Sequence, residues 1–322
     1  MVGKLTPDGQ LSASRTPVLL NASPYMTRNA LLNEFIQRDE GTFVDDFKAG
    51  EAAWWGNEFE GTIGTEAAKR LGLTGLQLEF DRAFQHADLP LAASLDGLGH
   101  GSGVIEADIS RGIYVINAKQ IDITGPGLLE IKNTSAMPEN EPARHRGPIQ
   151  GQAQLMCYPE ARWLAVCVLY QGIELRIFLY HRDSVMEMQI RDAVLDFERR
   201  RKERDYYPWT EANDAVLCYS TTDGKLPPLD LDPEDTDAMI ALEQLVLAKR
   251  KQADAEIDIE DAQMTLMEKM GNHETAFGIV GNQRIMLKWP MRKFKAQPER
   301  IVLAKEARTV RQKTLTIKEL DG

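Results

Sequence analysis

Two acidic residues and a lysine lie at the ends of apolar segments, where they could form a metal-dependent hydrolytic site. Asp96 closely follows the apolar run LPLAAS, and Glu130 and Lys132 lie two residues apart in a second run, GLLEIKN. On a strand, Glu130 and Lys132 share one face while Ile131 points into the core. Carboxylates hold hard divalent cations, and a neighbouring ammonium can orient a water. These residue types therefore predict metal-assisted hydrolysis of a phosphodiester.

A third carboxylate, Glu60, lies on a segment that we expect to be helical from about Glu51 to Arg70. Ala53, Gly56 and Glu60 recur at spacings of three and four, which places Glu60 near the small side of this helix. A carboxylate on that side can reach a neighbouring active site. The alternative is a solvated helix glutamate with no chemical role.

The segments around these residues alternate between strand and helix patterns, which predicts an α/β (α+β) fold. LQLEF and LPLAAS are expected to be two antiparallel strands, the second ending at Asp96. Asp96 and Glu130 are 34 positions apart, and three short strand-like runs fill the segment between them, which we expect to form a β-excursion on the same sheet. After Glu130 we expect a helix from Pro148 to about Cys157, two strands joined at Gln171-Gly172, and a charged helix from Asp183 to Tyr206.

Composition divides the chain into four parts. Residues 1–16 are polar and rich in Gly, Ser and Pro, so we expect a flexible N-terminus. A catalytic domain is expected over 17–210, including a helix from about Tyr25 to Gln37 capped by Asn21 or Ser23. Residues 211–237 are typical of an acidic linker. Residues 238–322 are predicted to form a helical and β-hairpin extension, with the hairpin turn at Gly281-Asn282.

The overall composition excludes several classes of protein. No apolar run approaches the roughly 20 residues of a membrane helix, so no membrane association is expected. The three cysteines form no C-x-x-C pair, which suits a reducing cytoplasm and argues against a zinc ribbon. The net charge of −11 argues against non-specific coating of DNA. The charge is uneven, because the chain carries eleven Lys and Arg against four Asp and Glu from Gly278 onward.

Four ordered motifs resemble those of a known family. WGNEFE, SLDGL, LEIK and QGQAQLM look like the successive motifs of lambda-type phage exonucleases, the YqaJ-like viral recombinase family. NAS at residues 21–23 also resembles the T-A-S of the family's first segment, and the similarity covers roughly Arg15 to Asp183. The family belongs to the PD-(D/E)xK nucleases. The resemblance implies a restriction-endonuclease-like core, a central mixed sheet flanked by helices.

The resemblance also assigns roles to individual residues. It implies metal binding by Asp96, Glu130, the Ile131 carbonyl and Glu60, and a catalytic role for Lys132 and Gln152. It implies that Arg15, Ser23 and Ser94 hold a 5′-phosphate of DNA. Two Mg²⁺ ions are expected per site, with Mn²⁺ as an alternative, because oxygen-only ligands favour these ions over Zn²⁺. His86 falls where the family places an additional acid, which would weaken the second metal site.

The expected function is a Mg²⁺-dependent 5′→3′ exonuclease. It would degrade linear double-stranded DNA and leave 3′ overhangs for phage-type recombination by single-strand annealing. The resemblance further implies a ring-shaped homotrimer, double-stranded DNA ends as substrate, a phage single-strand annealing protein as partner, and the cytoplasm of a bacterial host as location. Two alternatives remain: a structure-selective endonuclease of the same superfamily, and a non-catalytic protein that binds DNA ends. Apolar residues at helical spacing between Ala238 and Gly271 favour packing or oligomer contacts.

Overall fold

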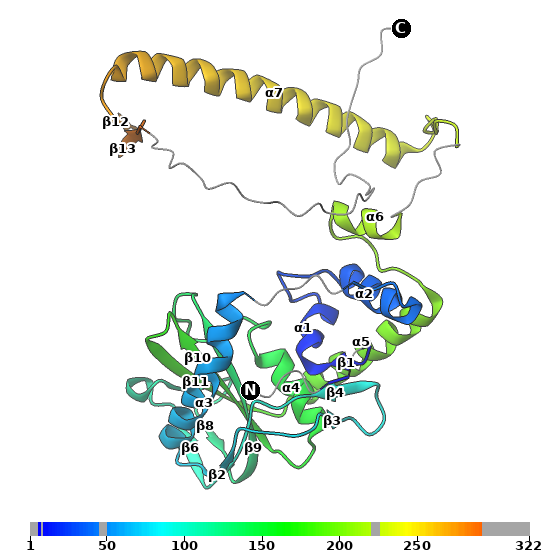
Figure 1. The fold of residues 1–322 in the computed structure, drawn as a ribbon, viewed down its shortest axis with the longest axis vertical. Helices are drawn as coiled ribbons and strands as arrows, with labels where there is room; N and C mark the ends of the chain where they lie inside the picture. The colour runs from blue at the N-terminus through cyan, green and yellow to red at the C-terminus, as the bar shows by residue number, and fades with distance from the viewer. Residues whose placement is uncertain (1–5, 8, 45–49, 220–225, 292–322) are drawn as a thin grey trace, which may run out of the picture. The chain divides into compact units, whose positions relative to one another are not determined.

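The chain forms two compact units, Met1–Tyr219 and Ser220–Gly322. The computed structural model describes residues 6–7, 9–44, 50–219 and 226–291, and Figure 1 traces them as a ribbon. Within these ranges, no helix combines the length and apolar character that crossing a membrane requires.

A mixed sheet of six strands forms the centre of the first unit. The order across the sheet is β2-β5-β9-β10-β11-β7. β9 pairs with β10 in parallel, while β5–β9 and β10–β11 are antiparallel. The expected central mixed sheet flanked by helices is confirmed. Its strands are β2 (Thr74–Gln77), β5 (Gly97–Gly101), β9 (Gly125–Thr134), β10 (Trp163–Tyr170), β11 (Glu174–His181) and β7 (Ile113–Val115).

Helices cover both faces of this sheet because the strands bury side chains on both sides. Alternate residues of β9 point to opposite faces, so Leu128 and Leu129 belong to different core clusters. Helix α3 (Glu51–Leu71) packs on the Leu129 side (Figure 1). Helices α4 (Pro148–Cys157) and α5 (Ser184–Glu203) pack on the Leu128 side. The predicted bounds of α3 and α4 agree with the structure to within a residue.

The N-terminal segment differs from the expectation of a flexible tail over 1–16. Residues 1–5 and 8 lie outside the described residues, but β1 (Leu11–Ser12) pairs in parallel with β4 (Leu91–Ala93). A short 3-10 helix, η1 (Ala13–Arg15), and helix α1 (Thr16–Leu19) follow directly. Leu11 is fully buried in the core. The prediction was wrong because a few apolar residues among polar ones suffice to hold this segment against β4.

Helix α2 (Arg28–Glu40) begins later than expected and has a different cap. The side chain of Thr27 accepts a hydrogen bond from the Ala30 N–H at 3.1 Å. Asn21 and Ser23, the two predicted caps, lie before the helix. Thr27 is the better cap because its backbone is extended and its hydroxyl faces the first free N–H groups of the helix.

The strands around Asp96 also pair differently from the prediction. β2 and β4 are not antiparallel partners: β2 pairs with β5, while β4 lies between β1 and β3 (Phe84–Gln85) in a separate three-stranded sheet. Asp96 therefore lies between two sheets, directly before β5. The expected excursion is split as well, since β6 (Val104–Glu106) and β8 (Gln120–Asp122) form their own sheet while β7 reaches the far edge of the central one.

The predicted linker over 211–237 begins with a helix, α6 (Ala212–Cys218). Asp214 is buried and accepts hydrogen bonds from the Thr27 hydroxyl and from the Thr210 N–H. This buried, hydrogen-bonded carboxylate holds α6 against the rest of the first unit, although the composition of this segment is typical of a linker. Residues 220–225 of the predicted linker lie outside the described residues.

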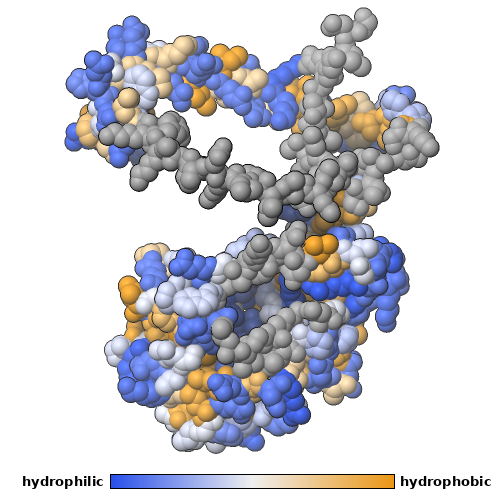
Figure 2. Space-filling view, viewed as in Figure 1, coloured by the Kyte–Doolittle hydropathy of each residue, from blue (hydrophilic) through white to orange (hydrophobic). Residues whose placement is uncertain are grey.

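The described part of the second unit contains one long helix and a hairpin. Helix α7 (Thr236–Met270) has 35 residues, and β12 (Thr275–Val280) pairs with β13 (Gln283–Lys288) around a turn in which Gly281 has φ +58°. Figure 2 shows hydrophobic residues interleaved with hydrophilic ones along this helix. The described part of the predicted extension thus has the expected elements. Residues 292–322 lie outside the described part.

We predict that Gly127→Ala destabilises the first unit by about 1–3 kcal/mol, the usual cost of overpacking a core. A Cβ at Gly127 on β9 would overlap the indole ring of Trp163 on β10. Gly61→Ala on α3 is the matched control, because a Cβ there meets nothing within 4 Å and should stabilise the helix by about 0.4–1 kcal/mol. Urea unfolding of both variants measures the difference, and equal stability of the two would contradict this packing.

Candidate active site

Asp96 lies between the end of β4, in the three-stranded sheet, and the start of β5, in the central sheet. It directly precedes β5, whose first residue, Gly97, lies opposite Leu129 on β9. The Ile131 N–H donates a hydrogen bond to Asp96 Oδ2 at 2.9 Å. This bond fixes the carboxylate of Asp96 beside the centre of β9. The predicted convergence of Asp96 with the Glu130–Lys132 strand is therefore what the structure contains.

Glu130 is fully buried on β9 and has two side-chain partners of different kinds. The Gln154 amide on α4 donates to Glu130 Oε2 at 2.6 Å, and the same amide reaches the Ser94 carbonyl at 3.2 Å. The Lys132 ammonium forms an ion pair with Glu130 Oε1. Oε1 is buried without a hydrogen bond of good geometry. Glu130 and Lys132 share one strand face, as the spacing of two predicts.

Glu60 reaches the same place from α3. Burial and then the nearby Asp96 carboxylate raise the pKa of Glu60 to about 7, and Glu60 and Asp96 share a hydrogen bond. The solvated alternative for Glu60 is therefore wrong, because the side chain is drawn into the acidic cluster. The side chain of Ala53, part of the same spacing argument, lies outside what the structure describes.

The cluster carries more negative charge than its one ammonium offsets. Burial and the Asp96 carboxylate raise the pKa of Glu130 to about 8. Burial alone would lower the pKa of Lys132, but Glu130 and Asp96 together raise it above its ordinary value. The carboxyls of Glu60 and Glu130 are thus harder to ionise beside Asp96, which is the situation that a bound cation relieves.

The donor chemistry fits a hard divalent cation. Glu60, Asp96 and Glu130 supply carboxylate oxygens, which such ions prefer. The described residues contain no group of three or more His, Cys, Asp or Glu side chains arranged to hold a metal ion. The acids instead meet as two pairs that share Asp96, with the Lys132 ammonium against Glu130. The role expected for the Ile131 carbonyl stays a prediction.

Gln152 is not the glutamine of this cluster, contrary to the prediction. Its amide donates to the His181 carbonyl at 2.8 Å, and its Oε1 accepts the Asp183 N–H at 3.0 Å. Gln152 therefore fastens α4 to the end of β11 and the start of α5. Gln150 and Gln154 are four residues apart and share a helix face that turns away from Gln152. The helical period was the signal that could have selected Gln154.

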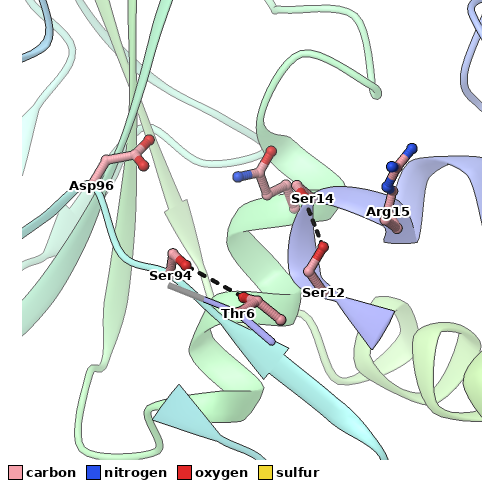
Figure 3. A pocket seen from close by; sticks show the side chains of 7 residues that line it. Thr6, Ser12, Ser14, Arg15, Ser94 and Asp96 are labelled. Atoms are coloured by element: carbon pink, nitrogen blue, oxygen red, sulfur yellow. Dashed lines mark hydrogen bonds between the residues drawn. The ribbon is translucent and has the colours of Figure 1, made fainter. Parts of the chain in front are cut away.

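A polar pocket lies against the acidic cluster. It has a volume of about 430 Å³, and Asp96 belongs to its wall. In Figure 3, Ser94 and Asp96 come from one segment and face Ser12, Ser14 and Arg15 across the opening. The Thr6 and Ser94 hydroxyls are 3.3 Å apart, and those of Ser12 and Ser14 are 2.8 Å apart. The full lining is Thr6, Ser12, Ser14, Arg15, Ser94, Asp96 and Gln150.

Two of the three residues expected to hold a phosphate line this pocket, and Ser23 does not. Arg15 and Ser94 are in the wall, whereas the Ser23 hydroxyl accepts the Tyr25 N–H at 3.2 Å in an exposed turn. The hydroxyls of Ser12 and Ser14 stand where Ser23 was expected. The sequence contained this signal, because Ser-Ala-Ser at 12–14 directly precedes Arg15 and matches the T-A-S pattern as well as NAS does.

Glu34 orients Arg15 but does not neutralise its charge, because Glu34 also pairs with Arg38. The Arg15 guanidinium lies 3.3 Å from both carboxylate oxygens of Glu34 on α2. Two guanidinium groups thus share one carboxylate. Hydroxyls beside such an arginine are typical of a site for a phosphate or carboxylate anion.

His86, where the family would place another acid, lies in a different setting. Its Nδ1 accepts the N–H groups of Asp88 and Leu89 at 3.0 and 3.1 Å. It lines a second cavity with Arg182 and Arg191 rather than the pocket beside Asp96. The imidazole therefore closes a turn.

Comparison with known proteins agrees with the motifs. Residues 7–157 match the model of the YqaJ-like viral recombinase domain. No curated protein matches the chain. Among solved structures, the alkaline exonuclease LHK-Exo from Laribacter hongkongensis, in complex with dAMP, is similar at 19% identity and a TM-score of 0.43. The match covers 61% of this chain and 89% of that one.

A phage-related exonuclease from Haemophilus somnus 129PT is also similar. Its identity is 10% and its TM-score 0.40, with 61% of this chain and 94% of that one covered. The family resemblance expected from the motifs is thus confirmed over residues 7–157.

We predict that Asp96→Asn lowers the pKa of Glu130 and of Glu60. The change removes a negative charge that favours the protonated form of both carboxyls, so each ionises at a lower pH. Carbon-detected NMR titration of the side-chain carboxyls in the presence of EDTA measures this. Asp88→Asn, in the turn that His86 closes, serves as the control. Unchanged titration of Glu130 in Asp96→Asn would show that the two acids do not interact.

Proposed function

We infer from the YqaJ-like viral recombinase domain at residues 7–157 that the chain is a phage-type exonuclease acting on linear duplex DNA. The observation that carries the proposal is the placement of one pocket. Asp96 belongs both to the acidic cluster and to the wall of the hydroxyl and arginine pocket. A site for an anion therefore directly adjoins a site for a cation, which suits a substrate held by one phosphate and cut at the next.

The cation we propose is Mg²⁺, with Mn²⁺ as a substitute and two ions per site. Asp96, Glu130 and the Ile131 carbonyl would hold one ion, and Glu60 and Asp96 the other. When bound, such an ion acts as a Lewis acid and lowers the pKa of a bound water. The buried Glu130 carboxylate supports this assignment, because a second cation beside it offsets charge that Lys132 alone leaves uncompensated.

Lys132 has a separate role in the chain's own chemistry. Burial lowers its pKa, but Glu130 and Asp96 together raise it above the ordinary value, so the ammonium keeps its proton at neutral pH. A permanent ammonium at the edge of the cluster can orient the attacking water. It also stabilises the negative charge that develops on the phosphate in the transition state.

The pocket gives the proposed direction of digestion. A terminal 5′-phosphate has the charge that Arg15 binds and the oxygens that the hydroxyls of Ser12, Ser14 and Ser94 can donate to. With the end held there, the acids lie next to the following phosphodiester. Cutting from 5′ ends would leave 3′ single strands, the substrate of a single-strand annealing protein, which we propose as the partner in a bacterial cytoplasm.

Exposed aromatic rings on α3, the helix that also carries Glu60, suit DNA as well. Trp54 and Trp55 on α3 are 47% and 42% exposed, and Trp55 stacks on Phe59 with ring centroids 5.4 Å apart. Nucleic-acid bases stack on such faces without regard to sequence. The ring-shaped trimer that the family resemblance implies belongs to this proposal as well.

Two alternatives would behave differently on simple substrates. A structure-selective endonuclease would cut a covalently closed duplex, which an exonuclease leaves intact. A protein that only binds ends would cut neither form. The direct test is digestion of linear and closed duplexes with Mg²⁺ and with EDTA. Cleavage of linear DNA alone, and only with the metal, supports the exonuclease; cleavage of closed circles would overturn it.

We predict that Lys132→Met and Asp96→Ala each reduce cleavage by about 1000-fold or more. Each removes an interaction worth several kcal/mol to the transition state, and 1.36 kcal/mol corresponds to tenfold in rate. Single-turnover digestion of a labelled linear duplex measures this, and circular dichroism checks the fold. Ser23→Ala should keep the native rate. Native rates in both site variants would remove the catalytic assignment.

We predict that Ser14→Ala and Arg15→Gln abolish the preference for ends that carry a 5′-phosphate. Each loses a hydrogen-bond donor to the phosphate, and a charge-assisted bond contributes about 1.5–3 kcal/mol. Rates on matched duplexes with and without the 5′-phosphate give the preference. Ser23→Ala, outside the pocket, should retain it. The pocket assignment fails if Ser23→Ala loses the preference while Ser14→Ala and Arg15→Gln keep it.

A further inference from the structure

Helix α7 carries an apolar stripe on one face, interrupted by Lys249 and Glu260. Leu242, Ala253 and Met264 follow one another at intervals of eleven residues, which is close to three helical turns, so they lie on one face. All three are exposed in the part of the chain that the structure describes. With 35 residues the helix is about 52 Å long. The stripe consists of Met239, Leu242, Val246, Ala253, Ile257, Met264 and Met267.

The charges of α7 are separated along the same helix. Lys249, Arg250 and Lys251 form a basic run just before its middle. Five acids follow within the next ten residues, at Asp254, Glu256, Asp258, Glu260 and Asp261. The helix is therefore basic on one side of its centre and acidic on the other.

We propose that α7 of one chain packs in an antiparallel pair against α7 of a second copy, with a two-fold axis at Ala253. In this arrangement, apolar residues of the stripe in one chain lie opposite apolar residues of the stripe in the other. Met239 and Met267 are each fourteen residues from Ala253, and Leu242 and Met264 are each eleven. Large apolar side chains thus meet large ones toward the ends. The small Ala253 side chain lies at the crossing point, where two helices come closest.

Charge selects the antiparallel orientation. About an axis at Ala253, Arg250 lies opposite Glu256 of the second copy, and Asp237 opposite its Lys269. A parallel two-fold pair must place each residue beside its own copy. Lys249–Lys251 would then face the same basic run, and the five acids would face themselves. Like charges directly opposed across a helix pair are destabilising.

The two charged residues that interrupt the stripe support the same choice. Lys249 and Glu260 lie on the stripe face, between its apolar residues. In the antiparallel register, Lys249 is one helical turn from the position opposite Glu260 of the second copy, within reach of its long side chain. In a parallel pair, each would be buried against an identical charge. The stripe therefore favours packing against the same helix of a second chain in the antiparallel orientation.

Pairing through α7 is independent of the chemistry of the first unit. It would join two nuclease units through their extensions, whatever assembly the units form by themselves. We propose that the partner of the stripe is α7 of a second copy of this chain. Binding of an unrelated protein, or of another segment of the same chain, would give no disulfide-linked pair of α7 helices.

Disulfide trapping in the full-length chain tests both pairing and orientation. In a Cys218→Ser background, Leu242→Cys and Met264→Cys chains are oxidised separately and as a 1:1 mixture, and covalent dimers are resolved on non-reducing gels. We expect several-fold more dimer in the mixture than in either chain alone. Ala248→Cys, on the opposite side of the helix, is the control for random collision. Equal trapping of Leu242→Cys alone would mean a parallel pair, and trapping no better than in the control would mean no pair; either result overturns the proposal.

Charge reversal gives a second, independent readout. The chain Lys249→Glu/Lys251→Glu has a mainly acidic centre, and Asp254→Lys/Glu256→Lys has a mainly basic one. Sedimentation equilibrium should show each variant alone at half the native mass, with the native mass restored in their 1:1 mixture. Native mass in both separate variants would contradict a charge-selected pair, and digestion of linear DNA confirms that the first unit is intact.

Discussion

The structure of the first unit depends on one unfavourable burial, that of the Glu130 carboxylate in the middle of the central sheet. Removing a carboxylate from water costs several kcal/mol unless charge and hydrogen bonds compensate. Lys132 and Gln154 compensate in part, and Asp96 works in the opposite direction by raising the pKa of Glu130. A site that keeps two acids side by side at such a cost is suited to bind a cation, and the active site that we propose follows from this property.

The surrounding elements serve to hold that carboxylate in place. β9 lies between β5 and β10, so Glu130 has no freedom to leave the sheet. The bond from the Ile131 N–H to Asp96 fixes the second acid, and α4 brings Gln154 against the first. The N-terminal segment closes the site, because β1 pairs with β4 and carries Ser12 into the wall of the pocket. Residues far apart in the sequence thus meet around one strand.

The spacing of residues in the sequence is sufficient to predict helix bounds and the residues that share a strand face. The common face of Glu130 and Lys132 follows from a period of two, and the bounds of α3 and α4 follow from helical periodicity. Strand partners were predicted wrongly, since LPLAAS is apolar enough for either sheet and only tertiary packing directs it to β1 and β3. The motif points to Gln152 and not to Gln154, because it gives the order of residues and not the helix face. Residues 11–16 pack against the core through Leu11, Ala13 and Thr16, and the polar composition of the segment does not reveal these contacts.

We propose that Asp96 and Glu130 together hold a cation, which would replace the present contact between Lys132 and Glu130. Crystals grown with Mn²⁺ and measured at its absorption edge test this directly, because the ion reports its own position. We predict an anomalous peak roughly 2.1 Å from oxygens of both Asp96 and Glu130, with the Lys132 ammonium moved away from Glu130 Oε1. Crystals at saturating Mn²⁺ that show a peak elsewhere, and none between these two carboxylates, would contradict it.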